Sequence, residues 1–268
     1  MIKKYRTLLT GVLATVLLSS CSEYQKVLKE DDVKKKYEMA EKLYSEGDYT
    51  RAIRLFDQIV PNYIGKPQGE RIIYFYADSY YQKEQYYQSA YQFERFAKSY
   101  PRSEKVEQAA FLGAKSEYLT SPKYSLDQAE TKEAIERLQV YINSYPESEK
   151  LEEANAMVQD LRRKLDKKSF EIAKQYNTIS DYFASIKSFE LFLKDNPGSE
   201  YREDALFYKF TAEYNLAMNS IYSKREERLN NAIETYNVLL EDYAEGQYRE
   251  DAEDMLTDIN KELEQFSK

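Results

Sequence analysis

The sequence predicts an all-α protein, a right-handed solenoid of about five helical hairpins. The chain of 268 residues has only 7 glycines and 6 prolines, whereas sheet-rich folds need such residues at every turn. In addition, five segments repeat one amphipathic helical pattern at recurring spacings, as expected when each hairpin must bury its apolar face against the next. A sandwich or barrel is therefore disfavoured.

The first element is a secretion signal, predicted over residues 1–20. A basic start with Lys3, Lys4 and Arg6 precedes an apolar run from Leu8 to Leu18, which is typical of a signal peptide and too short to span a bilayer. The run ends in the motif Leu18-Ser19-Ser20-Cys21, which resembles a bacterial lipobox and contains the only cysteine of the chain.

We therefore expect lipidation of Cys21 and a lipidated tether over residues 21–31. Acyl chains anchor a protein to the lipid bilayer without a spanning helix. Ser22 follows the cysteine, where many inner-membrane lipoproteins have aspartate, so we expect outer-membrane attachment. The alternative is an ordinary secretory signal with an incidental cysteine.

The second helix of each hairpin has a small residue followed four positions later by a large apolar one. Apolar residues at this spacing share one face of a helix. The five pairs are Ala52/Phe56, Ser89/Phe93, Ala134/Leu138, Ser185/Phe189 and Ala232/Tyr236. Pro101, Pro146 and Pro197 each stand eight positions after the large residue, where proline ends a helix.

The first helix of each hairpin has a large residue followed by a small one. The five pairs are Met39-Ala40, Tyr76-Ala77, Leu112-Gly113, Ile172-Ala173 and Phe210-Thr211. The spacings from these small sites to those of the second helices are 12, 12, 21, 12 and 21 residues. We expect the two insertions, at 120–132 and 222–230, to lengthen loops or helix ends, and 149–168 to add a helical stretch.

These patterns define one solenoid over residues 32–268. Its predicted parts are repeats near 33–64, 69–101, 104–146, 166–197 and 200–244, and a C-terminal capping helix over 247–266. The pattern resembles the tetratricopeptide repeat, although no tryptophan occupies its first site. A plain helical bundle is the alternative.

The signal, the repeat layout and the motif Tyr-Pro-x-Ser-Glu at 100–104 and 145–149 resemble the BamD (YfiO-like) family of outer-membrane lipoproteins. The resemblance implies a periplasmic scaffold of the β-barrel assembly machinery. Its C-terminal repeats would bind the barrel-forming subunit, and its N-terminal repeats would bind C-terminal segments of unfolded outer-membrane proteins. The alternative is a repeat lipoprotein scaffold for envelope division or polysaccharide export.

Composition argues against catalysis, metals and nucleic acid. The chain has no histidine and one cysteine, so histidine-dependent triads and imidazole or thiolate metal sites are excluded. We predict no catalytic residue and no cofactor. The net charge of −8 disfavours nucleic acid as a partner. Glycan binding is disfavoured by the absence of tryptophan, and the runs of acidic residues are typical of solvated helix ends rather than of a hydrolase.

Two sets of candidate binding residues follow from the repeat pattern. First-helix positions that point away from the packed stripe would form a substrate groove, because tyrosine offers a rigid ring with a polar tip. The groove residues are Tyr37, Glu41, Tyr44, Arg71, Tyr74, Asp78 and Tyr81. Arginine is enriched in interfaces, and the predicted contacts to the barrel-forming subunit are Arg202, Arg225, Arg228 and Arg249. For any single tyrosine, packing between repeats is the alternative role.

Overall fold

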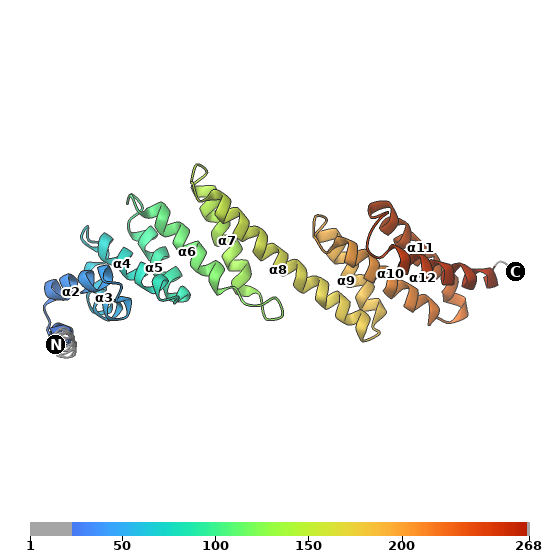
Figure 1. The fold of residues 1–268 in the computed structure, drawn as a ribbon, viewed down its shortest axis with the longest axis horizontal. Helices are drawn as coiled ribbons and strands as arrows, with labels where there is room; N and C mark the ends of the chain where they lie inside the picture. Colours follow the sequence, from blue (N-terminus) through green and yellow to red (C-terminus); the bar gives the residue numbers. More distant parts are fainter. Residues whose placement is uncertain (1–22, 267–268) are drawn as a thin grey trace, which may run out of the picture. The chain divides into compact units, whose positions relative to one another are not determined.

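The computed structural model describes residues 23–266, and every regular element within them is a helix. The all-α fold of consecutive hairpins is confirmed (Figure 1). The predicted signal peptide, residues 1–20, and the predicted lipidation site Cys21 lie outside the described residues. Within the described part, none of the helices combines the length and the apolar character needed to cross a membrane.

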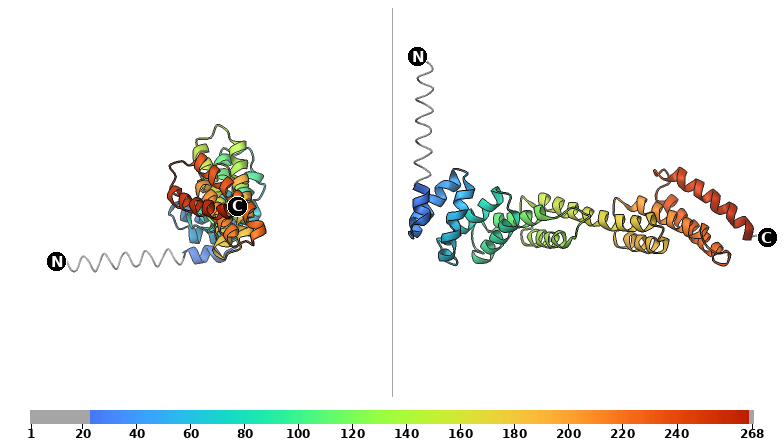
Figure 2. Two further views of the ribbon diagram at one scale, coloured as in Figure 1. Left: turned by 90° about the vertical axis from the view of Figure 1, so that its right-hand side faces the viewer. Right: turned by 90° about the horizontal axis from the view of Figure 1, so that it is seen from below.

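The chain divides into two compact units, where the sequence predicted a single solenoid. Of the described residues, the first unit comprises 23–121 together with Ala129–Val158. Its helices are α2 (Val33–Ser45), α3 (Tyr49–Tyr63), α4 (Gly69–Gln82), α5 (Tyr86–Ser99), α6 (Val106–Thr120), α7 (Ala129–Ser144) and the start of α8 (Leu151–Thr178). From α2 to α7, each helix packs against the next as successive hairpins (Figures 1 and 2).

The second unit comprises Pro122–Gln128 and the residues from Gln159 onward. Its helices are the end of α8, then α9 (Tyr182–Asp195), α10 (Arg202–Met218), α11 (Tyr222–Asp242), α12 (Arg249–Leu263) and the short 3-10 helix η1 (Glu264–Phe266). The Phe170 ring of α8 lies 5.8 Å from the Phe189 ring of α9, and α10 packs on both α9 and α11.

The repeat pattern explains how the hairpins pack. All ten residues of the second-helix pairs are buried, which places the small residues where helices approach closely. A Cβ added to Gly113 of α6 would lie 3.3 Å from the Cβ of Phe93 in α5. The Ser116 hydroxyl of α6 donates to the Ser89 hydroxyl of α5 at 3.0 Å. A small polar residue can therefore also occupy this close contact, because its buried hydroxyl has a hydrogen-bond partner.

Aspartates set the starts of three helices. Asp32 accepts hydrogen bonds from the backbone amides of Lys34 and Lys35, and Asp48 and Asp181 accept from amides in the first turns of α3 and α9. Such caps satisfy donors that have no partner within the helix. Gly47, with φ of +79°, precedes Asp48 in the tight turn between α2 and α3; this left-handed conformation favours glycine.

The two insertions and the added stretch take different forms. Residues 121–128 form a loop, in which the Gln128 side-chain amide donates to the carbonyls of Lys123, Leu126 and Asp127 at 2.8 to 3.0 Å. The second insertion instead lengthens the start of α11, which has 21 residues. The added stretch merges with the following repeat helix into α8, which has 28 residues.

Part of the segment expected to be a tether is packed structure. Residues 23–29 are helical, and Tyr24 and Val27 are buried at 2% and 8% exposure in the core of the first unit. Leu28 packs against the same core. These three apolar residues have the spacing of one helix face, which explains why the segment folds onto the first hairpin.

Candidate functional site

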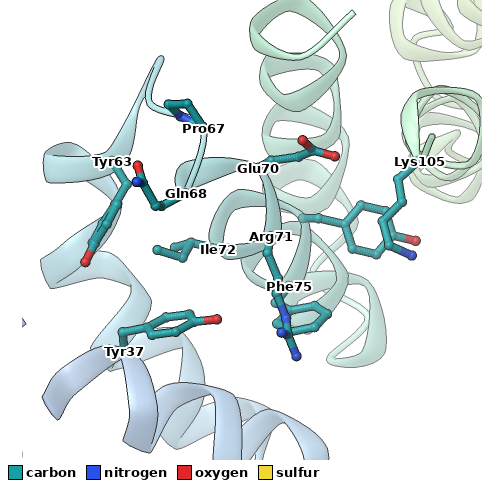
Figure 3. Close-up of a pocket in the computed structure, with 10 residues that line it drawn as sticks. Tyr37, Tyr63, Pro67, Gln68, Glu70, Arg71, Ile72, Phe75 and Lys105 are labelled. Atoms are coloured by element: carbon teal, nitrogen blue, oxygen red, sulfur yellow. The ribbon is translucent and has the colours of Figure 1, made fainter. Parts of the chain in front are cut away.

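A hollow in the first unit, which we call the α4 groove, combines aromatic walls with two cationic side chains. It has a volume of about 750 Å³. Its lining residues are Tyr37, Tyr63, Pro67, Gln68, Glu70, Arg71, Ile72, Tyr74, Phe75 and Lys105 (Figure 3). Helix α4 supplies half of them, α2 and the segment after α3 supply one wall, and the residue before α6 supplies the other.

The floor of the α4 groove is held by the core beneath it. Tyr74 is only 5% exposed, and its ring packs edge-on against Phe93 and Phe96 with centroid distances of 5.7 and 5.5 Å. The neighbouring ring of Phe75 stacks on Tyr44 of α2 at 4.2 Å. Packed aromatic pairs of this kind hold their rings in place, so the floor is a rigid surface.

The wall formed by the segment after α3 is fixed by one tyrosine. The Tyr100 hydroxyl, just after α5, donates to the carbonyls of Lys66 at 3.0 Å and Tyr63 at 3.3 Å. Gly69 begins α4 immediately beside these atoms, and a Cβ there would overlap both the Tyr63 carbonyl and the Tyr100 hydroxyl. A glycine is therefore needed at this close approach.

Two cations lie over aromatic rings of the α4 groove. The Arg71 guanidinium lies 5.1 Å from the centroid of Phe75 and pairs with Glu41 of α2. The Lys105 ammonium lies 4.6 Å from the centroid of Tyr74. The Arg71 side chain remains 62% exposed. Figure 3 shows this side chain lying next to the Phe75 ring. Such cations can bind a carboxylate while the rings contact apolar groups.

The remaining polar groups of the α4 groove are uncharged or already bonded. The Ser103 hydroxyl donates to the Glu70 carboxylate at 2.5 Å. Burial raises the pKa of both Tyr37 and Tyr74, so these hydroxyls stay protonated at physiological pH. The groove therefore favours a ligand that carries an aromatic or apolar side chain next to a negative charge.

Comparison with known proteins identifies the family. Residues 29–229 match the YfiO family, described as outer membrane lipoprotein. The chain belongs to the YfiO family of outer membrane lipoproteins. This match covers most of both units and supports attachment to the outer membrane.

Two individual proteins are also similar. One, from Aquifex aeolicus (strain VF5), is named provisionally as outer membrane protein assembly factor BamD; it is 26% identical over 99% of this chain and 87% of its own length. A solved structure, the TPR2AB domain of yeast Sti1 in complex with an HSP90 peptide, covers 85% of this chain and 98% of its own length at 14% identity, with a TM-score of 0.36. That structural similarity is too low to bear on function.

In this YfiO-family chain, three of the seven predicted groove residues line the α4 groove. These are Tyr37, Arg71 and Tyr74. Glu41 contributes as the partner of Arg71, whereas Tyr81 packs against Tyr86 at 5.8 Å and does not line the hollow.

The other two predicted groove residues bind each other. The Tyr44 hydroxyl donates to Asp78 at 2.6 Å, and Asp78 is only 8% exposed. Burial and the neighbouring Asp78 raise the pKa of Tyr44 far above its ordinary value, which keeps this donor protonated. The pair joins α2 to α4 and leaves neither side chain for a ligand.

Sequence reasoning missed seven lining residues of the α4 groove. They are Tyr63, Pro67, Gln68, Glu70, Ile72, Phe75 and Lys105. Three of them, Pro67, Gln68 and Lys105, come from segments between helices, whose positions do not follow from helical periodicity. The tyrosine and proline at the two ends of the segment 63–67 are the one local signal that this segment forms a wall.

The four predicted interface arginines all have partners inside the second unit. Arg202 pairs with Asp242 at 2.9 Å. Arg225 donates to the Ser220 carbonyl at 2.9 Å and pairs with Glu262. Since these contacts join α10 to α11 and α11 to α12, both arginines help hold the unit together.

The other two arginines differ in their surroundings. Arg249 binds Glu253 at 2.9 Å and Glu245 at 3.0 Å within or beside its own helix. Arg228 lies 5.0 Å from the centroid of Phe183, which is 59% exposed. Both Arg228 and Phe183 line a second hollow, of about 440 Å³, between α9, α10 and α11.

The second hollow has a buried ion pair in its wall. The Lys209 ammonium donates to Glu213 and to the Thr235 hydroxyl, each at 2.7 Å. Burial raises the pKa of Glu213, while Lys209 opposes this effect. Among the residues that the structure describes, no group of histidine, cysteine, aspartate or glutamate is arranged to hold a metal ion.

Proposed function

We propose that this protein is a lipid-anchored periplasmic scaffold of outer-membrane protein assembly, and that its α4 groove binds the C-terminal segments of unfolded outer-membrane proteins. Membership of the YfiO family and the name of the Aquifex relative support the general role. The observation that carries the finer proposal is the pairing of Arg71 and Lys105 with aromatic rings in one hollow.

The chemistry of the α4 groove fits a chain end that has an aromatic side chain beside its carboxylate. The ligand ring would contact Tyr37, Tyr63 and Phe75. The carboxylate would bind Lys105, which has no acidic partner among the ion pairs of the described residues, or would compete with Glu41 for Arg71. Capture of a terminal carboxylate is an established mode of peptide recognition.

A charge reversal tests this groove. We expect Lys105→Glu to weaken binding of an aromatic-ended barrel peptide with a free carboxylate by about tenfold, the equivalent of ~1.4 kcal/mol. The same peptide with an amidated end should bind both proteins equally weakly. Lys83→Glu is the matched control, because Lys83 is also exposed and lies outside the groove. Equal affinity of Lys105→Glu and the parent for the free-acid peptide would contradict the proposal.

We further propose that the second unit binds the barrel-forming subunit around Phe183 and Arg228. Exposed aromatic residues and arginines are the usual anchors of protein interfaces, and this pair borders a hollow. Phe183→Ala should reduce co-purification of that subunit from membranes. Leu191→Ala is the control, because Leu191 lies on the same helix with 58% exposure against 59% for Phe183. Equal retention by both variants would remove Phe183 from the interface.

Cys21 is the proposed lipid attachment site. It is the only cysteine of the chain, and the YfiO family is one of lipoproteins. The mass of the mature N-terminal peptide tests this assignment directly. An unmodified or absent Cys21 in membrane-bound protein would contradict it.

A further inference from the structure

The segment next to the proposed lipid site is part of the folded body. Tyr24 and Val27 belong to the same core cluster as Ile72 and Tyr74, which line the α4 groove. The Arg51 guanidinium of α3 lies 5.4 Å from the centroid of the Tyr24 ring. Tyr24 is therefore fixed to the start of α3, and through the core to the groove.

The chain between Cys21 and Tyr24 is short. Three residue steps span at most about 10 Å, even when the backbone is fully extended. A lipid on Cys21 would therefore place the ring of Tyr24, and the helix ends that contact it, close to the headgroup layer. No conformation of the intervening residues can change this upper limit.

We propose that the helix at residues 23–29 is a rigid spacer that holds the start of α3 against the lipid headgroups, so that the α4 groove opens close to the membrane surface. This inference rests on the lipidation of Cys21 in the proposed function. It adds to that function a docking face, formed by the spacer helix and the first turns of α3, whose partner is the lipid surface.

The charges on this docking face are compatible with lipid phosphates. Lys26 and Lys29 on the spacer helix and Arg54 on α3 are exposed cations, and the Lys26 side chain is 77% exposed. Against them stands the exposed Glu23. Glu30 is paired with Lys35 at 3.0 Å and lies 3.9 Å from Lys26, and Asp48, just before α3, is paired with Arg51 at 2.5 Å. Cations near an anionic lipid surface each add about 1 kcal/mol of attraction, and the lipid chains supply the anchoring.

Fluorescence can test the docking face because the chain has no tryptophan. Thr50→Trp places a probe on an exposed position of α3 next to Arg51. The lipidated variant would be reconstituted in vesicles of phosphatidylethanolamine and phosphatidylglycerol that contain a lipid with a nitroxide on its headgroup. We expect strong quenching of this tryptophan. Val140→Trp, at a position 54% exposed on α7, is the control and should be quenched much less.

A flexible linker inserted between Cys21 and the spacer helix tests whether the short, rigid connection is what holds α3 near the membrane. About 15 Gly/Ser residues inserted before Glu23 add an average reach of ~21 Å and leave the packed residues unchanged. We expect the insertion to abolish most of the quenching at Thr50→Trp while the helix content measured by circular dichroism stays the same. Quenching at Thr50→Trp that equals that of Val140→Trp, or that the insertion does not change, would overturn the proposal.

The mass of the N-terminal peptide distinguishes failure of the spacer proposal from failure of the proposed lipid anchor on Cys21. Acylated protein whose Thr50→Trp probe is not quenched would overturn the spacer and leave the lipid anchor intact. Protein without acyl chains on Cys21 would overturn the anchor and the spacer together. Peptide binding to the α4 groove, measured in detergent, is independent of both results.

Discussion

The Tyr44 hydroxyl donates a hydrogen bond to the Asp78 carboxylate at 2.6 Å, and this bond joins the first hairpin to the second. The Gln82 side-chain amide also donates to Asp78, at 3.3 Å on the other carboxylate oxygen. Tyr44 also stacks on Phe75 of the α4 groove. The pair thus supports the groove from behind and does not itself face a ligand.

Removing the Tyr44 hydroxyl should destabilise the first unit. In Tyr44→Phe, the buried Asp78 oxygen loses its short hydrogen bond while the stacked ring remains. Leaving such a group unsatisfied costs about 1–3 kcal/mol, which urea unfolding can measure. Tyr87→Phe is the control, because Tyr87 is 63% exposed; equal unfolding midpoints for the two variants would show that the bond does not contribute.

Glu117 should make stability depend on pH. Burial raises the pKa of this carboxyl from its ordinary value of 4.5 to about 6, although Arg137 lies 3.1 Å away and opposes the effect. The folded state therefore binds the proton more tightly than the unfolded state. The contribution of Glu117 to stability improves as pH falls through 6 towards 4.5, by about 2 kcal/mol at most.

The test of this pH dependence is the variant Glu117→Gln. Its stability relative to the parent protein should be higher at pH 8 than at pH 5, since glutamine carries no charge at either pH. Urea midpoints at the two pH values give the comparison. Glu136→Gln, at an exposed position of the same helix α7, is the control and should show no such difference. A Glu117→Gln variant whose stability changes with pH in the same way as that of Glu136→Gln would contradict the prediction.

A methyl group at Gly69 should disturb the wall of the α4 groove. In Gly69→Ala the added Cβ overlaps the Tyr63 carbonyl and the Tyr100 hydroxyl, so the segment after α3 must move. We expect a loss of about 1–3 kcal/mol, typical of overpacking, together with weaker peptide binding. Gly198→Ala is the control because nothing lies within 4 Å of its added Cβ. Equal melting temperatures would show that the close approach is not needed.

A charge swap separates the structural and binding roles of Arg202. This arginine pairs with Asp242 at 2.9 Å, and both side chains are partly exposed, so the pair should contribute no more than about 1 kcal/mol. Arg202→Asp alone should lower the melting temperature, and adding Asp242→Arg should restore it. If Arg202 also contacts the barrel-forming subunit, co-purification stays reduced in the double variant. Full recovery of co-purification would assign Arg202 a structural role only.

Local patterns predicted the helices because each depends on residues close in sequence. The stripe positions such as Ala52 and Phe56 are buried, and the small residues lie where helices approach. The same reasoning could have found the helix at 23–29, since Tyr24, Val27 and Leu28 have helical spacing. So short a helix becomes stable only by packing on the first hairpin, and its own sequence does not specify that packing.

The sequence by itself determined the fold class, the order of the hairpins and the family resemblance. The reason is that each repeat carries the same small and large apolar residues at the positions where its helices pack. Only the tertiary structure decided which side chains a ligand can reach. Tyr74 and Phe75 are neighbours in sequence, yet Tyr74 packs mainly into the core while Phe75 lies beneath Arg71. Tyr44, Asp78 and Arg202 bind partners that are 34 to 40 residues away. Such pairings depend on how hairpins meet in space, and no local pattern specifies them.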